Sequence, residues 1–268
     1  MKELAVIYMV AGISSRFEGK AKQLAKVGPQ GETLIEYSLK QALSAGFNKI
    51  IFIVGEKTEK PFKELFGNQY QGIPIEYAFQ KYDPEKRDKP WGTLDALCQI
   101  RNIINSPFIV CNGDDIYGKE SFKLLYQHLQ QHQTSATLGY KLQNVLPDKG
   151  FVNRGIFKIQ NNKVISIDET FNISKENLSE KNLTSDSLCS MNIFALPQNN
   201  LKDLDLILTK FKEEHNGDKK IESLLPVELT NLIKENKLIM EIYPTPEKWY
   251  GLTNPEDELI LKEQLKNI

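Results

Sequence analysis

The strongest constraint on the fold of this chain is a repeated order of apolar runs and helical segments in its first half. Four short runs rich in β-branched residues are typical of buried strands: residues 4–9, 49–54, 73–79 and 107–112. Helical patterns fill the gaps between them: residues 33–47, 58–67 and 92–104. Because consecutive parallel strands need right-handed crossover connections, this βαβαβαβ order predicts a parallel sheet with helices on both faces.

The segment 33–47 carries the clearest helix boundaries. Thr33 and Glu36 fit the capping box S/T-x-x-E, in which each residue satisfies a backbone N–H of the other. Gly46 stands where a C-cap glycine would end the helix. We therefore expect a helix that begins after Thr33 and ends at Gly46.

The second half is richer in strands. The segments "SATLGYKL", "RGIFKIQNNKVISI", "CSMNIFAL" and "KLIMEIYP" read as strands, and helical patterns return at 199–214 and 221–236. The asparagines in "NNK" at 161–163 indicate a hairpin turn, and the polar segment 170–187 indicates a mobile loop. We expect one α/β domain over residues 1–268. A mostly parallel, Rossmann-like sheet flanked by helices occupies about 1–134, and a more β-rich half occupies about 135–268.

Charge and cysteine content narrow the functional classes. Lysine and arginine (34) nearly balance aspartate and glutamate (35), so the net charge of the chain does not attract nucleic acid or an anionic membrane. The three cysteines lie far apart without a CxxC pair, and no segment reaches the length of a membrane span. The first apolar run continues into a basic loop instead of a signal-peptide cleavage site. These features predict a cytoplasmic protein whose partners are small molecules, with neither nucleic acid nor membrane among them.

Three loops stand where ligands bind in open parallel sheets, beyond the carboxyl ends of the strands. They are residues 10–24, 80–93 and 112–118. The first combines small residues with Arg16 and Lys22, which suits a phosphate chain held by backbone N–H groups and cationic side chains. Its spacing is not that of a Walker A loop, and a solvated basic loop is the alternative.

The other two loops add carboxylates and an amide. Asp114 and Asp115 follow a buried strand, and Mg²⁺ prefers one or two carboxylates together with phosphate oxygens. If the backbone stays extended, the two side chains point to opposite sides, so we expect only Asp114 to face the site. Gln80 could pair with a nucleobase edge, and Gly92 would allow close approach to a flat ring. An Asp-rich turn and a plain Pro/Gly turn are the alternatives, but together the three loops suit a nucleoside triphosphate.

These residues resemble the nucleotidyltransferases that make nucleotide sugars, the NDP-sugar pyrophosphorylases. "AGISSRFEGKAKQL" is similar to the family's A-G-x-G-[ST]-R…P-K signature, "PWGTLDAL" to its G-T-x-x-A-[LI] stretch, and "VCNGDDIYG" to its [LV]-x-x-G-D segment. The later "FVNRGIFKI", "KVISIDE" and "EKWYGLTNPEDE" look like its substrate-half pieces, so the resemblance covers almost the whole chain. It implies a GT-A-like fold with a nucleotide-binding half and an acceptor-binding half.

The resemblance also implies roles for individual residues. Arg16 would hold the leaving phosphates, Lys22 would touch the α-phosphate, and Asp114 would bind Mg²⁺, the implied cofactor. The remaining contacts would fall to two groups of residues. Nucleotide binding would involve Ala11, Gly12, Ser14, Ser15, Gln80, Gly92 and Thr93. Acceptor binding would involve Gly150, Arg154, Glu169 and Asn192.

Four positions depart from the family pattern. Ser14 replaces a glycine, and Ala21 replaces the proline before the lysine. Thr170 replaces a lysine for the acceptor phosphate, which leaves Arg154 as the nearest substitute. Gly251 stands where many members place a second metal aspartate. Asp257 or a water molecule is the substitute we consider for that carboxylate.

The expected reaction joins a pyrimidine nucleoside triphosphate (UTP, CTP or dTTP) to a sugar 1-phosphate and releases pyrophosphate. A cytidylyltransferase for a phosphorylated alcohol, amine or phosphonate is an alternative. A GT-A-type glycosyltransferase would normally carry D-x-D, whereas here the acids are adjacent. A non-catalytic nucleotide-binding module also remains open, and the sequence allows a homo-oligomer.

Overall fold

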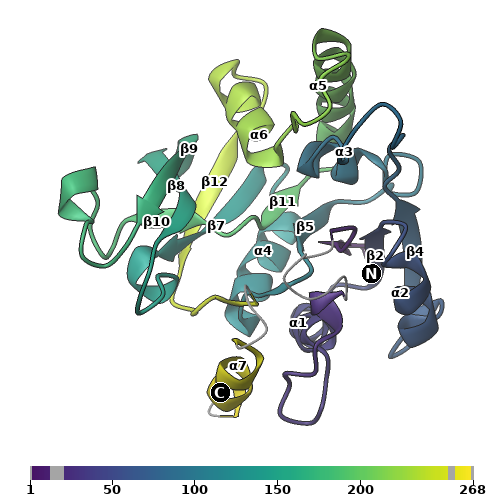
Figure 1. Ribbon diagram of the computed structural model, residues 1–268, viewed down its shortest axis with the longest axis horizontal. Coiled ribbons are helices and arrows are strands. Elements are labelled where there is room, and N and C mark those ends of the chain that lie inside the picture. The colour runs from purple at the N-terminus through teal and green to yellow at the C-terminus, as the bar shows by residue number, and fades with distance from the viewer. Residues whose placement is uncertain (1, 13–20, 253–256, 267–268) are drawn as a thin grey trace.

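The computed structural model describes residues 2–12, 21–252 and 257–266. The strands of the described residues form one large sheet (Figure 1) and a second, two-stranded sheet. The large sheet consists of β1 Ala5–Met9, β2 Lys49–Val54, β3 Gln69–Tyr70, β4 Ile73–Phe79, β5 Phe108–Asn112, β7 Ser135–Lys141, β8 Val152–Gln160, β9 Lys163–Ile173, β10 Leu188–Ser190, β11 Phe194–Leu196 and β12 Met240–Thr245. Its strand order is β10-β8-β9-β12-β7-β11-β5-β1-β2-β4-β3. The small sheet pairs β6 Asp115–Ile116 with β13 Tyr250–Gly251.

The parallel core lies where the sequence predicts it. Strands β5, β1, β2 and β4 are neighbours and all pair in parallel. Strand β11 joins this core to the second half by antiparallel pairing with both β5 and β7. Beyond β7, the long hairpin of β8 and β9 makes the second half richer in β-structure. The mixed α/β fold class predicted from the sequence is confirmed.

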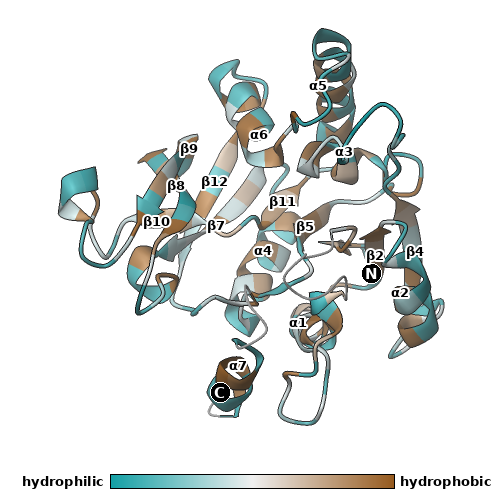
Figure 2. Cartoon of the chain, in the orientation of Figure 1, coloured by the Kyte–Doolittle hydropathy of each residue, from teal (hydrophilic) through white to brown (hydrophobic). Residues whose placement is uncertain are grey.

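Except for the last helix, which packs against Leu34, Ile116 and Leu252, helices cover both faces of the large sheet. They are α1 Leu34–Ala45, α2 Glu59–Phe66, α3 Thr93–Cys98, α4 Lys119–Gln131, α5 Asn200–Glu214, α6 Leu225–Lys234 and α7 Asp257–Leu265, with short 3-10 turns η2 Lys22–Leu24, η3 Leu142–Asn144 and η4 Ser179–Lys181. Because side chains alternate across a strand, Val6 and Tyr8 of β1 pack towards α1, α2 and α4. Ala5 and Ile7 pack towards α3, α5 and α6. Figure 2 shows β2, β4 and β11 mostly in brown, whereas β8, β10 and the helices α2 and α6 show both brown and teal.

The local signals mostly give the right boundaries. Helix α1 has the predicted capping box, in which Thr33 Oγ1 accepts from the Glu36 N–H at 3.3 Å and Glu36 Oε2 accepts from the Thr33 N–H at 2.8 Å. Gly46 ends it with a left-handed backbone, φ 115°. The predicted hairpin turn is confirmed at Asn161 and Asn162, both with positive φ.

Two predicted boundaries are wrong. Residues 170–173, expected in a loop, extend β9 because they continue the ladder with β8, where Val152 lies opposite Ile173. The helix expected over 92–104 is α-helical only through Cys98, and tighter three-residue turns continue it to residue 103. No helix among residues 2–12, 21–252 and 257–266 is both long and apolar enough to cross a membrane.

Candidate active site

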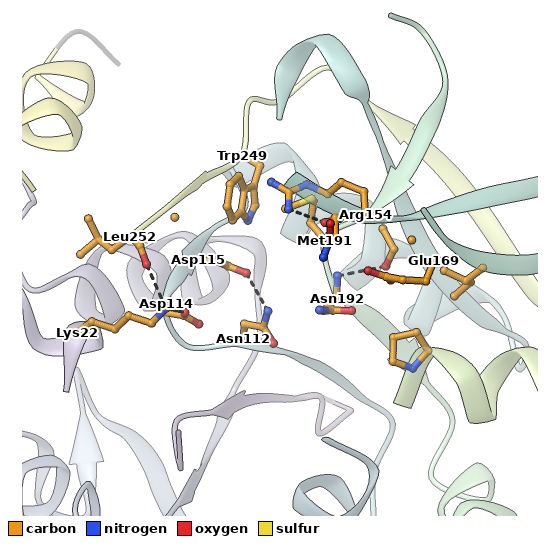
Figure 3. Close-up of a pocket in the computed structure, with 16 residues that line it drawn as sticks. Lys22, Asn112, Asp114, Asp115, Arg154, Glu169, Met191, Asn192, Trp249 and Leu252 are labelled. Carbon is orange, nitrogen blue, oxygen red and sulfur yellow. Dashed lines mark hydrogen bonds and ion pairs between the residues drawn. The ribbon is translucent and has the colours of Figure 1, made fainter. Parts of the chain in front are cut away.

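A polar pocket of about 260 Å³ lies beyond the carboxyl end of β5, where the two halves of the chain meet (Figure 3). Its lining comes from η2, the β5–β6 turn, the strands β8, β9 and β10, and the segment around β13. Ligand pockets for drug-sized molecules span roughly 300–1,000 Å³. The described walls therefore enclose room for a small polar group, such as the phosphate end of a substrate, and not for a whole drug-sized molecule.

Lys22 and Asp114 meet at one wall of this pocket. Lys22 lies on η2 and forms an ion pair with Asp114 in the turn after β5. Its Nζ also donates to the carbonyl of Leu252 at 3.1 Å. Each of the two side chains keeps about a fifth of its surface exposed (21% and 23%), so both can reach a ligand.

Asp115 faces the same pocket, which corrects the expectation that only Asp114 would. The chain leaves the extended conformation at Gly113 and Asp114, which form a turn, so strand alternation does not apply to the two acids. Asp115 Oδ2 accepts from Asn112 Nδ2 at 3.0 Å and from the Tyr117 hydroxyl at 3.1 Å. Burial, reinforced by the charge of Asp114, raises the pKa of Asp115 to about 8.

Gly251 lies opposite Asp115. The two residues are paired in the small sheet of β6 and β13. A Cβ added to Gly251 would lie 2.9 Å from Asp115 Oδ1 and 2.5 Å from the ring of Trp249. A side chain therefore does not fit at position 251 in this backbone.

Arg154, Glu169 and Asn192 line the opposite wall (Figure 3). The Arg154 guanidinium lies 5.3 Å from the centre of the Trp249 ring. Arg154 Nε and Trp249 Nε1 are both buried, and neither has a hydrogen-bond partner in the described part of the chain. Burial raises the pKa of Glu169, while Arg154 opposes that shift. Of the expected acceptor residues, Gly150 is exposed and lies outside this lining.

Gln80 lies at the end of β4, outside the pocket lining, and its amide is fixed by two acceptors. Its Nε2 donates to the Gly92 carbonyl at 3.0 Å and to Asp95 Oδ2 at 2.8 Å. Asp95 is buried, and its other oxygen lies 2.5 Å from Lys212 Nζ on α5. The Gly92 carbonyl and the Asp95 carboxylate can only accept hydrogen bonds. If the Gln80 amide were flipped, its oxygen would face these two oxygens without a proton between them. Only the Oε1 acceptor is left for a ligand.

Gly92 and Thr93 have contacts within the protein. A Cβ on Gly92 would lie 2.5 Å from the Ser223 carbonyl, so the glycine permits close packing of this turn against the start of α6. The Thr93 hydroxyl accepts from the Leu225 N–H at 2.9 Å. Their contact with a nucleotide stays a prediction, as does that of Gln80.

The remaining predicted residues lie at or beyond the end of β1. Ala11 and Gly12 follow this strand after Val10 and lie outside the pocket lining. Ser14, Ser15 and Arg16 lie outside the described residues. Lys22, Asp114, Arg154, Glu169 and Asn192 are the predicted residues that the structure brings into one pocket.

Asp115 and Trp249 line the pocket but were not predicted from the sequence, and neither was Asp95, which holds Gln80 outside the pocket. The two adjacent acids of "GDDIYG" could have indicated Asp115, but the assumption of an extended strand placed its side chain on the side away from the pocket. Asp95 had no usable signal because its partner Lys212 is 117 residues away. Trp249 had only its neighbouring glycine as a signal.

A Rossmann-like sheet with a polar pocket at the carboxyl ends of its strands defines an α/β protein of the nucleotide-binding class. A family model described as nucleotidyl transferase matches residues 10–255, and the chain belongs to this family. No protein of curated function matches the chain in a sequence comparison.

Solved structures share the fold over nearly the whole chain. A putative glucose-1-phosphate thymidylyltransferase from Bacillus anthracis superposes with a TM-score of 0.70 at 17% identity, covering 99% of this chain and 96% of that chain. A UDP-glucose pyrophosphorylase complexed with UDP-glucose gives 0.66 at 17% identity, with 100% and 99% covered. The inositol-1-phosphate CTP transferase from T. maritima gives 0.68 at 12% identity, with 99% and 96% covered.

Proposed function

We propose that this protein transfers the nucleotidyl group of a pyrimidine nucleoside triphosphate to a sugar 1-phosphate in the cytoplasm, releasing pyrophosphate. The observation that carries the proposal is the pocket in which Lys22 and Asp114 lie across from Arg154 and Glu169. One wall comes from the nucleotide-binding half of the sheet and the other from the β-rich half. Such a pocket can hold the reacting phosphate groups of two substrates against each other.

The reaction needs positioning and charge compensation more than proton transfer. An acceptor phosphate has a second pKa near ~6 and is mostly dianionic at neutral pH, so it attacks without a general base. Two unit charges 4 Å apart repel by about 4 kcal/mol at an effective dielectric of about 20. Lys22 at one wall and Arg154 at the other supply fixed positive charge to offset this repulsion.

The donor set fits a divalent metal. Asp114 is partly exposed in the pocket beside a second carboxylate, and Mg²⁺ takes one or two carboxylates together with phosphate oxygens. When bound, Mg²⁺ would neutralise phosphate charge and help to orient the triphosphate. Lys22 would then exchange its contact with Asp114 for one with a phosphate oxygen.

The acceptor wall has unsatisfied donors that suit a phosphate. The buried N–H groups of Arg154 Nε and Trp249 Nε1 are unpaired within the described chain. Each buried N–H group that is left without an acceptor lowers the stability of the folded protein by about 1–3 kcal/mol. A phosphate oxygen would satisfy them once the Arg154 and Trp249 side chains turn these N–H groups towards the pocket. Glu169 and Asn192 beside them could accept or share hydrogen bonds with acceptor hydroxyls.

The amide of Gln80 favours uracil or thymine as the base. Its remaining acceptor, Oε1, matches the N3–H group of these bases. It can also accept from the amino group of cytosine, but it cannot donate to cytosine N3. We therefore propose UTP or dTTP ahead of CTP.

The test is pyrophosphate release from each of five nucleoside triphosphates with sugar 1-phosphates, inositol 1-phosphate and phosphocholine in Mg²⁺. We expect release only when triphosphate and acceptor are both present. Lys22→Met should lower kcat by about 100-fold or more, which is the usual loss when one fixed transition-state donor is removed. Lys26→Met is the matched control, since Lys26 is an exposed lysine four residues away and outside the pocket.

Three results would contradict the proposal. One is full activity in Lys22→Met, and another is activity lost equally in Lys26→Met. The third is release of UDP from a sugar nucleotide without any pyrophosphate chemistry, which would instead support the glycosyltransferase alternative.

A further inference from the structure

We propose that Asp115 supplies the second carboxylate of the divalent metal site, binding the ion through Oδ1 beside Asp114. The inference rests on the proposed function, because it assigns a ligand to the metal which that reaction would use. It concerns a position where the chain departs from its family: Gly251 offers no carboxylate where many members place an aspartate.

The pairing of β6 with β13 puts Asp115 at the place that a side chain from position 251 would reach. Asp115 lies directly opposite Gly251 in this ladder. A Cβ built on Gly251 would lie only 2.9 Å from Asp115 Oδ1, and Trp249 ring carbons would lie 2.5 and 2.6 Å away. The carboxylate oxygen of Asp115 and the Trp249 ring therefore fill the space next to Gly251. An aspartate at 251 would require both the Trp249 ring and the Asp115 carboxylate to move from these positions.

The two oxygens of Asp115 have different surroundings. Oδ2 is held by the Asn112 amide and the Tyr117 hydroxyl, which fixes the orientation of the carboxyl group. Oδ1 receives no hydrogen bond from any residue that the structure describes, although Asp115 lines the pocket and is only 5% exposed. Oδ1 is therefore the oxygen of this fixed carboxyl group that remains available to a cation in the pocket.

Both carboxylates reach the same pocket because of the turn at Gly113 and Asp114. Asp115 begins β6, directly after Asp114, and each residue lines the pocket (Figure 3). Asp257, the other substitute considered for the missing aspartate, begins α7 and is not part of the lining. Two carboxylates from adjacent residues meet the preference of Mg²⁺ for one or two protein carboxylates, with water and phosphate completing the shell.

The test is direct titration of the protein with Mn²⁺ alone, followed by electron paramagnetic resonance of the free ion. Asp115→Asn keeps the size of the side chain and can still accept from Asn112 and Tyr117, but it replaces Oδ1 with an amide. We expect Asp115→Asn and Asp114→Asn each to weaken Mn²⁺ binding by at least about tenfold, the lower bound for loss of even an outer-shell partner. Glu169→Gln, which removes a carboxylate charge from the opposite wall, should bind Mn²⁺ within about twofold of the parent.

Unchanged Mn²⁺ affinity in Asp115→Asn, with a clear loss in Asp114→Asn, would overturn the inference. Should Asp115→Asn fail to fold, as judged by circular dichroism, crystals of the parent soaked in Mn²⁺ decide the question by anomalous scattering. The expected result is an ion within about 2.5 Å of both Asp114 and Asp115 Oδ1. An ion bound to Asp114 but remote from Asp115 would overturn the inference.

Pyrophosphate release separates this inference from the proposed function. If the parent transfers nucleotide while Asp115→Asn binds Mn²⁺ normally, the function stands and the assignment of Asp115 fails. If both aspartates prove to bind Mn²⁺ but no triphosphate and acceptor pair releases pyrophosphate, the metal site stands and the proposed reaction fails.

Discussion

At the scale of single residues, the orientation of one amide connects the loop after β4 to a distant helix. Gln80 is fixed by Asp95, and Asp95 is paired with Lys212 on α5. Asp95→Asn removes one of the two fixed acceptors of Gln80 Nε2, so the Gly92 carbonyl alone holds the amide and the amide turns more easily to donate. Asp95 is therefore a positioning residue for whatever Gln80 contacts.

The first prediction at this scale concerns base selectivity. In Asp95→Asn, the ratio of kcat/KM for UTP to that for CTP should fall about tenfold, which corresponds to one hydrogen bond of about 1.4 kcal/mol. Asp205→Asn is the control, since Asp205 lies on α5 and pairs with Arg101 on the surface. Steady-state kinetics with both triphosphates measure the ratio. A ratio that stays constant in Asp95→Asn would show that Gln80 does not select the base.

The second prediction concerns Trp249. Trp249→Phe keeps an aromatic ring near Arg154 but removes the buried, unpaired Nε1 donor. The KM for the phosphorylated acceptor should rise about tenfold, because one hydrogen bond to a charged phosphate contributes about 1.5 kcal/mol. The KM for the triphosphate, measured on the same sample, is the internal control. A rise in both constants would indicate a general packing defect instead.

At the scale of elements, glycines set how closely neighbouring segments approach. Gly92, the N-cap of α3, has φ 99°, and a Cβ there would lie 2.5 Å from the Ser223 carbonyl before α6. Gly217 has a similar φ of 95°, but a Cβ there would have no described atom within 4 Å. An alanine at 217 would meet only the strain of a positive φ, whereas an alanine at 92 would meet that strain and a steric overlap. Comparison of the two variants therefore measures the cost of the overlap.

We expect Gly92→Ala to destabilise the protein more than Gly217→Ala. Positive φ alone costs of order 1 kcal/mol for alanine, and overlap with fixed backbone adds typically 1–3 kcal/mol. Urea unfolding of both variants gives the difference in the free energy of unfolding. Equal losses would mean that the α3–α6 junction adjusts without cost.

At the scale of the whole molecule, His128 joins the helix layer to the sheet. It is a buried residue of α4, with Nε2 2.8 Å from the Thr134 carbonyl and Nδ1 3.0 Å from the Tyr243 hydroxyl on β12. Burial lowers the pKa of His128, and the stacked ring of His132 acts in the same direction, while Glu241 and the Thr134 hydrogen bond oppose it.

This pKa shift makes stability depend on pH in a defined window. Below about pH 6.5, the unfolded chain binds a proton at His128 that the folded protein resists, so stability falls as the pH drops. The slope from this residue is at most about 1.4 kcal/mol per pH unit. Urea unfolding between pH 7.5 and 5.5 should show a flatter dependence in His128→Asn. An unchanged slope would exclude His128 as the source.

Local patterns were enough to predict the parallel core and the boundaries of α1. Alternating side chains and the capping box act between residues a few positions apart, so the sequence displays them directly. The site was partly predictable for a different reason: parallel strands end at one edge, which brings the loops carrying Lys22 and Asp114 together.

Amino-acid order alone determined the α/β class, the helix caps, the hairpin at Asn161 and Asn162, and the loops that carry the candidate site. Tertiary structure decided which carboxylates face the pocket, which group Gln80 can offer, and why position 251 is a glycine. The physical reason is the distance along the chain. Asp115 meets Gly251, and Asp95 meets Lys212, only after crossovers bring these segments side by side, and no local pattern encodes such contacts.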